Sequence, residues 1–407
     1  MPNLRLIEFM GEASALFRFI PYAFSLSWSR PKIEASIASG VTRRHVRCGC
    51  IVALASGLLA CSPLSLETRV TGSSADGLVF VRLVHGVKDI ARARIRDGAV
   101  APLLETPDRE EDWPYWSDAA GRLLLQVKPL PKDARSDLVL WNPADGSEHP
   151  LAASVERNEQ WAMWSKDGRA VVYAFGGKSP ASGIGVIDVG SGLVRLAATA
   201  GARDFFFRPH FAPDGLSIAA QRRWADSPGS SLWLLQIDSP PRAFRDDRNS
   251  FYQKQWFTRD GGSIVYTMKP TAGGLREIYL SAATPDSTPR ALAPDAAADD
   301  HSAIPSPVRD EVAFVSNRAG SMDIFLVNLS GGEPRNLTQT PDIDEYAPHW
   351  SPDGTRIVAT AEPAHPRPPG AGDDLDLEKA TVLVIDREGK KLLETPGFMP
   401  DWMPAWP

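Results

Sequence analysis

Cysteine is scarce in this chain. Its 407 residues include three cysteines, Cys48, Cys50 and Cys61, and none follows residue 61. A disulfide framework and a cysteine-based metal site are therefore excluded for the long C-terminal segment. That segment also has no Gly-X-Ser-X-Gly motif, which excludes the serine nucleophile of an α/β-hydrolase.

Positive charge is also in short supply after residue 60. Residues 61–407 hold 37 Lys and Arg against 47 Asp and Glu, which gives this segment a net charge of −10. An acidic segment without a basic stripe argues against a nucleic-acid partner. Helical periodicity is nearly absent after residue 70, so we expect an all-β fold.

A five-residue turn recurs along this segment: an aromatic residue, then Ser, Thr or Ala, any residue, Asp and Gly. Looser copies stand at Trp116 and Pro305, and the first positions are spaced by 48, 47, 46, 48 and 45 residues. Such a period with several short strands in each repeat is typical of a β-propeller. The four full copies are Trp164–Gly168, Phe211–Gly215, Phe257–Gly261 and Trp350–Gly354.

Each repeat predicts a four-stranded blade. After the turn Pro352-Asp353-Gly354, β-branched and apolar runs at 357–360 and 380–385 predict two strands, and 391–393 predicts a short last strand. We expect the recurring Trp or Phe to pack between blades, where burying it is worth roughly 1.5–3 kcal/mol.

The two ends of this segment predict how the ring closes. Residues 74–104 contain a turn and three strands without a first strand, while 400–407 contain a first strand alone. Joined, they complete one blade, so we predict a single propeller over 72–407 with seven blades; six is the alternative if one repeat is misread.

The N-terminal region resembles a bacterial lipoprotein signal. Arg43 and Arg44 begin a basic stretch, and the apolar run 48–59 is too short to span a bilayer, which takes about 20 residues. The sequence Leu58-Leu59-Ala60-Cys61 resembles a lipobox, which implies cleavage before Cys61 and lipid attachment to it; an ordinary signal peptide is the alternative. We expect 1–60 to be an extension with signal peptide whose true start lies near residue 41, and 61–71 to be a tether.

The repeats closely resemble the WD-like units of the TolB propeller family. Residues 350–358 close one of these units, residues 316–325 match the middle segment of the unit, and residues 331–338 match its end. The resemblance covers roughly 70–407. It implies a periplasmic propeller of a kind that serves in protein docking, beside serine peptidases, or as a lyase. The chain departs from TolB itself because it has no room for the N-terminal α/β domain and counts to seven blades rather than six.

Candidate site residues come from the face opposite the Asp-Gly turns, where the longest loop is 362–379. We expect an acidic ring at the channel mouth that binds a cation or a basic partner, with Trp224 as an exposed aromatic; the alternative is that these carboxylates are solvated turn residues. The candidate binding residues are Arg223, Trp224, Asp300, His301, Asp344, Glu345, Asp373 and Asp374.

A three-histidine metal site formed by His210, His301 and His349 is a weaker hypothesis. His210 and His349 occupy equal positions in different repeats, which favours a packing role and predicts that they lie well apart. We therefore expect no metal, no cofactor and no catalytic residue.

The leading hypothesis is a monomeric, lipid-anchored propeller on the periplasmic side of the bacterial outer membrane, since Ser62 rather than Asp follows Cys61. It binds an envelope protein, peptide or glycan on its long-loop face, and touches the membrane through the lipid alone. The alternatives are a metal-assisted lyase or hydrolase with its site at the channel mouth, and a passive spacer.

Overall fold

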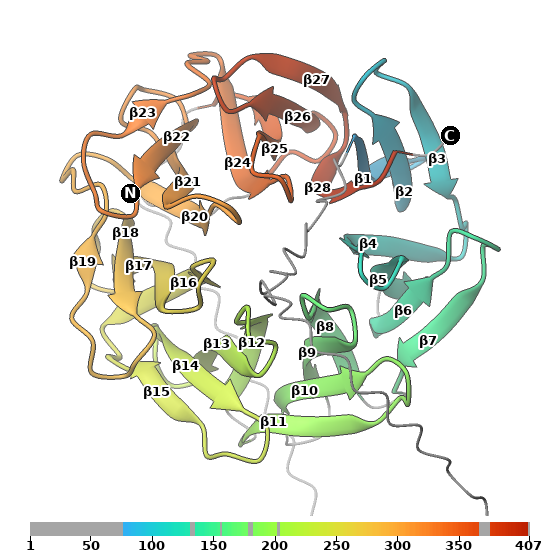
Figure 1. Cartoon of the computed structure of the whole chain (residues 1–407), viewed down its shortest axis with the longest axis horizontal. Helices are drawn as coiled ribbons and strands as arrows, with labels where there is room; N and C mark the ends of the chain where they lie inside the picture. Colours follow the sequence, from blue (N-terminus) through green and yellow to red (C-terminus); the bar gives the residue numbers. More distant parts are fainter. Residues whose placement is uncertain are drawn as a thin grey trace, which may run out of the picture. The chain divides into compact units, whose positions relative to one another are not determined.

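The structure is a computed structural model, and it describes residues 76–130, 135–154, 157–177, 182–201, 204–365 and 375–405. These residues form seven antiparallel four-stranded sheets, arranged as blades in a closed ring (Figure 1). All of the elements among them are strands. The predicted seven-bladed propeller is therefore confirmed, and the alternative of six blades is wrong. Among the described residues, no helix has the length and apolar character needed to cross a membrane.

We number the blades I to VII in the order in which they follow one another around the ring. Blade I contains β28 (Phe398–Met403), β1 (Gly77–Val84), β2 (Val87–Arg94) and β3 (Val100–Leu104). Blade II contains β4 (Arg109–Ser117), β5 (Arg122–Pro129), β6 (Asp137–Trp141) and β7 (Glu148–Ala152). Blade III contains β8 (Arg157–Trp164), β9 (Ala170–Gly177), β10 (Ser182–Asp188) and β11 (Val194–Ala200).

The other four blades repeat the same order of strands. Blade IV contains β12 (Asp204–Phe211), β13 (Ser217–Trp224), β14 (Ser230–Gln236) and β15 (Arg242–Arg245). Blade V contains β16 (Ser250–Phe257), β17 (Ser263–Pro270), β18 (Glu277–Ala282) and β19 (Arg290–Ala291). Blade VI contains β20 (Asp300–Pro305), β21 (Glu311–Ser316), β22 (Asp323–Asn328) and β23 (Arg335–Asn336). Blade VII contains β24 (Ile343–Trp350), β25 (Arg356–Pro363), β26 (Thr381–Asp386) and β27 (Lys391–Pro396).

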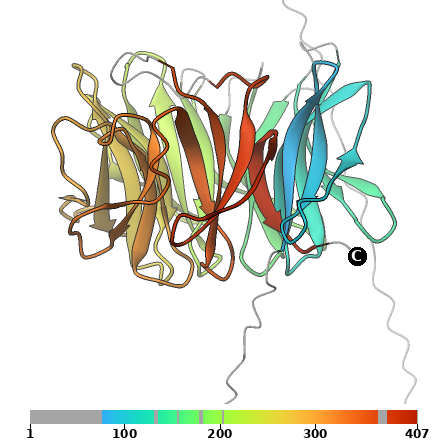
Figure 2. The same cartoon turned by 90° about the horizontal axis from the view of Figure 1, so that it is seen from above.

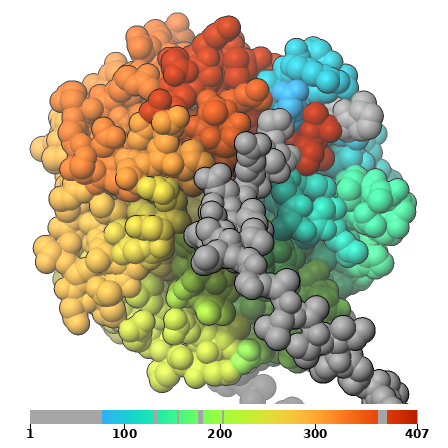
Figure 3. All heavy atoms as spheres, in the orientation of Figure 1, coloured from blue at the N-terminus to red at the C-terminus, as the bar shows by residue number. Residues whose placement is uncertain are grey.

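The ring closes as the sequence predicts. Strand β28 pairs with β1, so that Met403 lies opposite Gly77 and Trp402 opposite Leu78. The C-terminal strand thus completes the blade that the N-terminal three begin. The blades fill successive sectors of the disc, and their strands run between its two faces (Figures 2 and 3).

The Asp-Gly turns are built by local hydrogen bonds. In blade VII, the Ser351 hydroxyl donates to the Asp353 carboxylate at 2.6 Å, and the Thr355 amide donates to the same carboxylate at 3.0 Å. Gly354 has φ of 64°, a left-handed conformation that glycine adopts without steric cost. The same hydroxyl-to-Asp bond recurs at Asp167 and Asp260.

The hydrophobic core is divided among the blade interfaces. Seven apolar clusters lie in the described structure, each built mainly by two neighbouring blades. The recurring tryptophans help to join them, because the indole N–H of one blade donates to a carbonyl in the first strand of the preceding blade. These bonds run from Trp164 to Tyr115 at 3.0 Å, from Trp350 to Ile304 at 3.1 Å and from Trp402 to His349 at 3.2 Å. The predicted packing of these residues between blades is confirmed.

Candidate functional site

The first strand of every blade carries a β-bulge at the same position. In blade II, Asp112 lies opposite Gln126 and Tyr115 opposite Leu124, so two residues on β4 oppose one on β5. The first bulged residue has a left-handed conformation, with φ between 47° and 52° in all seven blades. A bulge of this kind turns a side chain out of the sheet pattern. The seven residues are Trp113, Trp161, Arg208, Lys254, Ser302, Ala347 and Met399.

These seven bulged residues line one cavity of about 600 Å³ in the channel. The residue two positions after each bulged residue faces the same way, and six of these residues also line the cavity. The residue between them is buried in every blade, although the prolines at this position, Pro114, Pro209, Pro348 and Pro400, also touch the cavity. In six blades the innermost strand therefore presents two further side chains to the cavity: the bulged residue, which we call the upper level, and the residue two positions after it, which we call the lower level.

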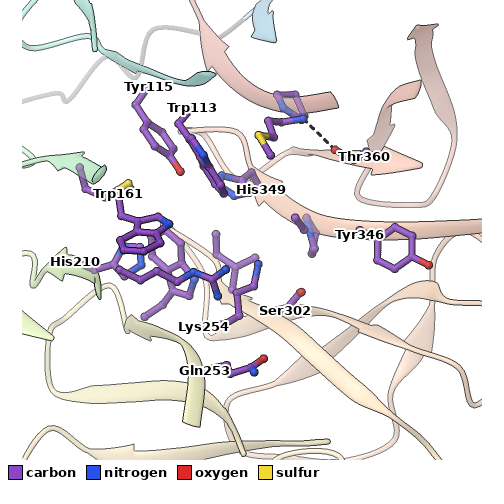
Figure 4. A pocket seen from close by; sticks show the side chains of 18 of the residues that line it. Trp113, Tyr115, Trp161, His210, Gln253, Lys254, Ser302, Tyr346, His349 and Thr360 are labelled. Atoms are coloured by element: carbon purple, nitrogen blue, oxygen red, sulfur yellow. Dashed lines mark hydrogen bonds between the residues drawn. The ribbon is translucent and has the colours of Figure 1, made fainter. Parts of the chain in front are cut away.

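The cavity wall is chemically uneven. Trp113 and Trp161 stand on the neighbouring blades II and III, and the cations Arg208 and Lys254 on the next two, IV and V. Blades VI and VII contribute the small residues Ser302 and Ala347 at the same level, which leaves room beside them. Figure 4 shows Trp113, Trp161, Lys254 and Ser302 around the cavity. No aspartate or glutamate lines this cavity within the described part of the chain.

Three aromatic rings lie together on the lower level of the wall. The imidazole of His210 lies against Trp256 with ring centroids 3.9 Å apart, and the ring of His349 meets the same indole edge-on at 6.1 Å. The prediction that these two histidines lie well apart is wrong, because blades IV and VII face each other across a narrow channel and one indole fills the space between.

Both imidazoles are neutral at pH 7. Burial, together with the positive charge of Arg208, lowers the pKa of His210 to about 3. Burial and the charge of Lys254 lower the pKa of His349 to about 4. The lower level therefore offers neutral nitrogen donors and acceptors next to an indole, and the positive charge in the cavity comes from Arg and Lys side chains.

Blade I contributes the one carboxylate among the seven lower-level positions. Asp401 accepts a hydrogen bond from the Trp116 amide at 2.9 Å. Burial raises the pKa of Asp401 to about 7, and burial and this carboxylate both raise the pKa of Tyr115. Asp401 therefore titrates well above the usual range of an aspartate.

The acidic residues predicted at the channel mouth are buried between strands instead. The side chains of Asp300, Asp344 and Glu345 are at most 4% exposed. Asp300 pairs with Arg318 at 2.7 Å, and Asp344 accepts the Met322 amide of the preceding blade at 2.9 Å. The prediction of a solvent-facing acidic ring is wrong for these residues, because blade packing covers the junction between the entering loop and the first strand.

Glu345 shows most clearly what these buried carboxylates do. It accepts hydrogen bonds from the hydroxyls of Thr340 at 2.6 Å and Thr338 at 2.9 Å. Burial raises the pKa of Glu345 to about 8, and these two hydrogen bonds only partly oppose that effect. The residue ties the loop that enters blade VII to its first strand.

The remaining predicted residues do not form one site. His301 is 1% exposed and stacks on Tyr346, with ring centroids 6.4 Å apart. Trp224 ends β13 and is 5% exposed beneath the guanidinium of Arg248, so its predicted exposure is wrong, whereas Arg223 is exposed. Asp373, Asp374 and Cys61 lie outside the described residues.

The described residues do not fit the three-histidine metal site. His301 is buried away from the cavity wall, and Trp256 stands between His210 and His349. No group of three or more His, Cys, Asp or Glu in the described part of the chain could hold a metal ion. Lining cations also disfavour a divalent metal. The metal-assisted lyase or hydrolase stays a prediction.

The sequence also carries a signal for the bulges, separate from the recurring turns. In four blades a proline follows the bulged residue, two positions before the recurring aromatic residue: Pro114, Pro209, Pro348 and Pro400. Proline lacks an amide hydrogen, so inside a sheet it is tolerated at bulges and edges. A proline at this repeated position predicts a bulge, and the residue before it is then the channel residue.

No protein-family model and no curated protein matches the chain. Among solved structures, an oligogalacturonate lyase in complex with manganese matches with a TM-score of 0.57 and 14% identity, over 71% of this chain and 83% of that one. A prolyl endopeptidase matches with a TM-score of 0.52 and 14% identity over 71% of this chain, which spans 43% of the peptidase. TolB from Acinetobacter baumannii matches with a TM-score of 0.47 and 14% identity, over 80% of this chain and 82% of that one. The two higher-scoring likenesses show that the chain shares its propeller fold with these enzymes.

Proposed function

We propose that this chain is a binding propeller of the bacterial cell envelope that takes its ligand in the channel cavity. The observation that carries the proposal is the ring of seven bulges. They share one backbone conformation, and all seven bulged residues line the same cavity. A left-handed conformation costs a residue other than glycine of the order of 1–3 kcal/mol. Such strain concentrates at functional sites, and a cavity of this size accommodates a small molecule or the end of a larger one.

The cavity lies toward the face that the sequence predicts for binding. Its wall includes Lys269 at the end of β17 and Leu375 in the long connection between β25 and β26. A protein, peptide or glycan partner could therefore contact the loops of this face and insert one group into the channel. Loops on a rigid scaffold are common binding sites.

Affinity capture with the full chain tests this proposal. The purified chain is incubated with a cell-envelope extract, and retained molecules are identified by mass spectrometry. We expect a ligand that the wild type retains and the double variant Trp113→Ala/Trp161→Ala loses. Leu216→Ala is the control, since Leu216 is 70% exposed beside an Asp-Gly turn. Residues 364–379 of the long loop are replaced by a Gly-Ser linker in a further variant. Capture that survives the double variant but is lost in the linker variant would place the site on the loop and not in the cavity.

The proposed anchor is a lipid on Cys61, which places the propeller on the periplasmic side of the outer membrane. Its support is the lipobox-like sequence alone. Several acyl chains together anchor a protein stably, at about 0.8 kcal/mol per buried CH₂. We expect Cys61→Ser to abolish lipid labelling and to move the chain out of the membrane fraction. Cleavage without labelling in the wild type would instead show an ordinary signal peptide.

A further inference from the structure

The cavity reverses the charge of the propeller around it. Residues 61–407 carry a net charge of −10, yet Arg208, Lys254 and Lys269 line the cavity and no carboxylate does so within the described part of the chain. Arg276, which directly precedes β18, also lines the wall, and it donates two hydrogen bonds of 2.8 and 3.0 Å to Asp299. Four cationic side chains of blades IV and V therefore line the cavity.

Aromatic surface stands beside these cations. Trp161 is on blade III, next to Arg208 on blade IV, and Trp256 lies below Lys254 on the same strand of blade V. A wall of this kind offers a flat apolar surface to one part of a ligand and a charged hydrogen-bond donor to another. Charged donors bind carboxylates and phosphates, and Arg does so through two parallel bonds.

The opposite side of the cavity provides the space for such a ligand. Ser302 and Ala347 are the smallest of the seven bulged residues, and their blades VI and VII lie across the ring from blade III, which carries Trp161 (Figure 1). A volume of about 600 Å³ holds a ligand of one or two rings. The neutral imidazoles of His210 and His349 leave the balance of charge on this wall positive.

We infer that the cavity takes an anionic ligand with a flat ring, whose carboxylate or phosphate binds Arg208 and Lys254 and whose ring packs on Trp161. This inference rests on the proposed function, because it names the ligand class of the same cavity. The carboxylate and the phosphate share the chemistry that these cations recognise, and the experiment below separates them.

Four probes with one ring system test the inference: 1-naphthoate, 1-naphthyl phosphate, neutral 1-naphthol and cationic 1-naphthylmethylamine. Their affinities for the full chain are measured by calorimetry and by quenching of tryptophan fluorescence. We expect the two anions to bind at least tenfold more tightly than naphthol, and the amine to bind least. The tighter anion identifies the preferred acid group.

Variants of the wall separate charge from ring packing. Arg208→Gln and Lys254→Gln should each lower the affinity for the two anions about tenfold, as expected for a lost hydrogen bond to a charged group. The affinity for naphthol should not change. Trp161→Ala should weaken all of the probes. Lys166→Gln, an exposed lysine in an Asp-Gly turn, is the matched control, and circular dichroism confirms that each variant is folded.

Two outcomes would overturn the inference, and they differ in what they mean for the proposed function. If naphthol and the anions bind equally and all depend on Trp161, the cavity is a ligand site but does not select for charge. If no probe binds and the captured envelope ligand is also insensitive to Trp113 and Trp161, the cavity is not the ligand site at all.

Discussion

Two regions of each blade repeat around the ring, and they repeat in different ways. At the Asp-Gly turns the residues themselves recur, since Asp167, Asp260 and Asp353 each accept the same hydroxyl hydrogen bond. At the channel bulges the first bulged residue keeps its backbone conformation but not its identity: φ stays between 47° and 52° while the side chain changes from tryptophan to alanine. Turn side chains have to form hydrogen bonds with neighbouring backbone groups. The backbone of a bulge is held by the strand pairing on either side, so its side chain can differ from blade to blade.

A third repeated feature belongs with the turns. Asn158, Asp299 and Asp344 occupy equal positions before the bulge, and each accepts a backbone amide from the start of the third strand in the preceding blade, at 2.8 to 3.1 Å. These three side chains join neighbouring blades. The comparison therefore separates residues that hold the ring together from residues that line its channel.

The largest expected effect is the loss of one of these inter-blade carboxylates. Asp299 and Arg276 form a buried ion pair, and although burial would raise the pKa of Asp299, hydrogen bonds and the charge of Arg276 hold it below its usual value. Asp299→Ala leaves that guanidinium buried without its carboxylate, and we expect the free energy of unfolding to fall by about 3–5 kcal/mol. Urea denaturation measures this.

The channel provides the matching control for that experiment. Arg208 is a cation of the same type, but it lines the cavity and is partly solvent-accessible. We expect Arg208→Ala to cost less than about 1 kcal/mol, within the range of substitutions outside a packed core. An equal loss of stability in both variants would break the distinction between the two groups of residues.

A smaller effect is expected from exchanging alanine and glycine at left-handed positions. In Gly354→Ala the new Cβ would lie 2.3 Å from Cγ2 of Val308 at a φ of 64°, so we expect a loss of about 1–3 kcal/mol. In Ala347→Gly the relieved strain and the added freedom of the unfolded chain oppose each other, so the change should stay below about 1 kcal/mol. Thermal unfolding compares the two variants. A loss of stability in Ala347→Gly as large as that in Gly354→Ala would show that the bulge, like the turn, depends on the residue at this position.

The remaining effect is the dependence of stability on pH. Burial raises the pKa of Glu345 to about 8, above the 4.5 of the unfolded chain, so the folded state holds its proton more tightly. The resulting stability is complete below about pH 4.5 and is lost as pH rises through about 8. The lowered pKa values of His210 and His349 affect stability only below about pH 6.5. We therefore expect unfolding to become easier between pH 6.5 and 8.5.

The variant Glu345→Gln tests whether Glu345 causes this pH dependence of stability. It keeps hydrogen-bonding oxygen and nitrogen atoms beside Thr338 and Thr340 but does not titrate, so it should flatten the slope of the melting temperature over this pH range. Glu394→Gln, at an exposed position, should leave the slope unchanged. A slope that is identical in wild type and Glu345→Gln would assign the effect to other buried carboxylates such as Asp401.

The errors of prediction concern residues whose environment is set by a neighbouring blade. Asp300 and Glu345 are charged and stand beside a loop, which predicts exposure, but the adjacent strands cover both. Trp224 follows two arginines and ends a strand, and the guanidinium of Arg248 from the connection between β15 and β16 lies over it. A periodic pattern predicts which residues lie on each face of one sheet. It does not predict how far the neighbouring sheet covers the ends of its strands.

The sequence by itself determined the blades, their number and the closure of the ring. The reason is that the turn is local: Ser351, Asp353 and Gly354 complete its hydrogen bonds within a few residues, and the period of the turns counts the blades. Tertiary structure alone decided which residues meet in the channel. Trp161, Lys254 and Ser302 are far apart in sequence, and they line one cavity only because paired strands set the bulge register and the closed ring brings seven bulges together.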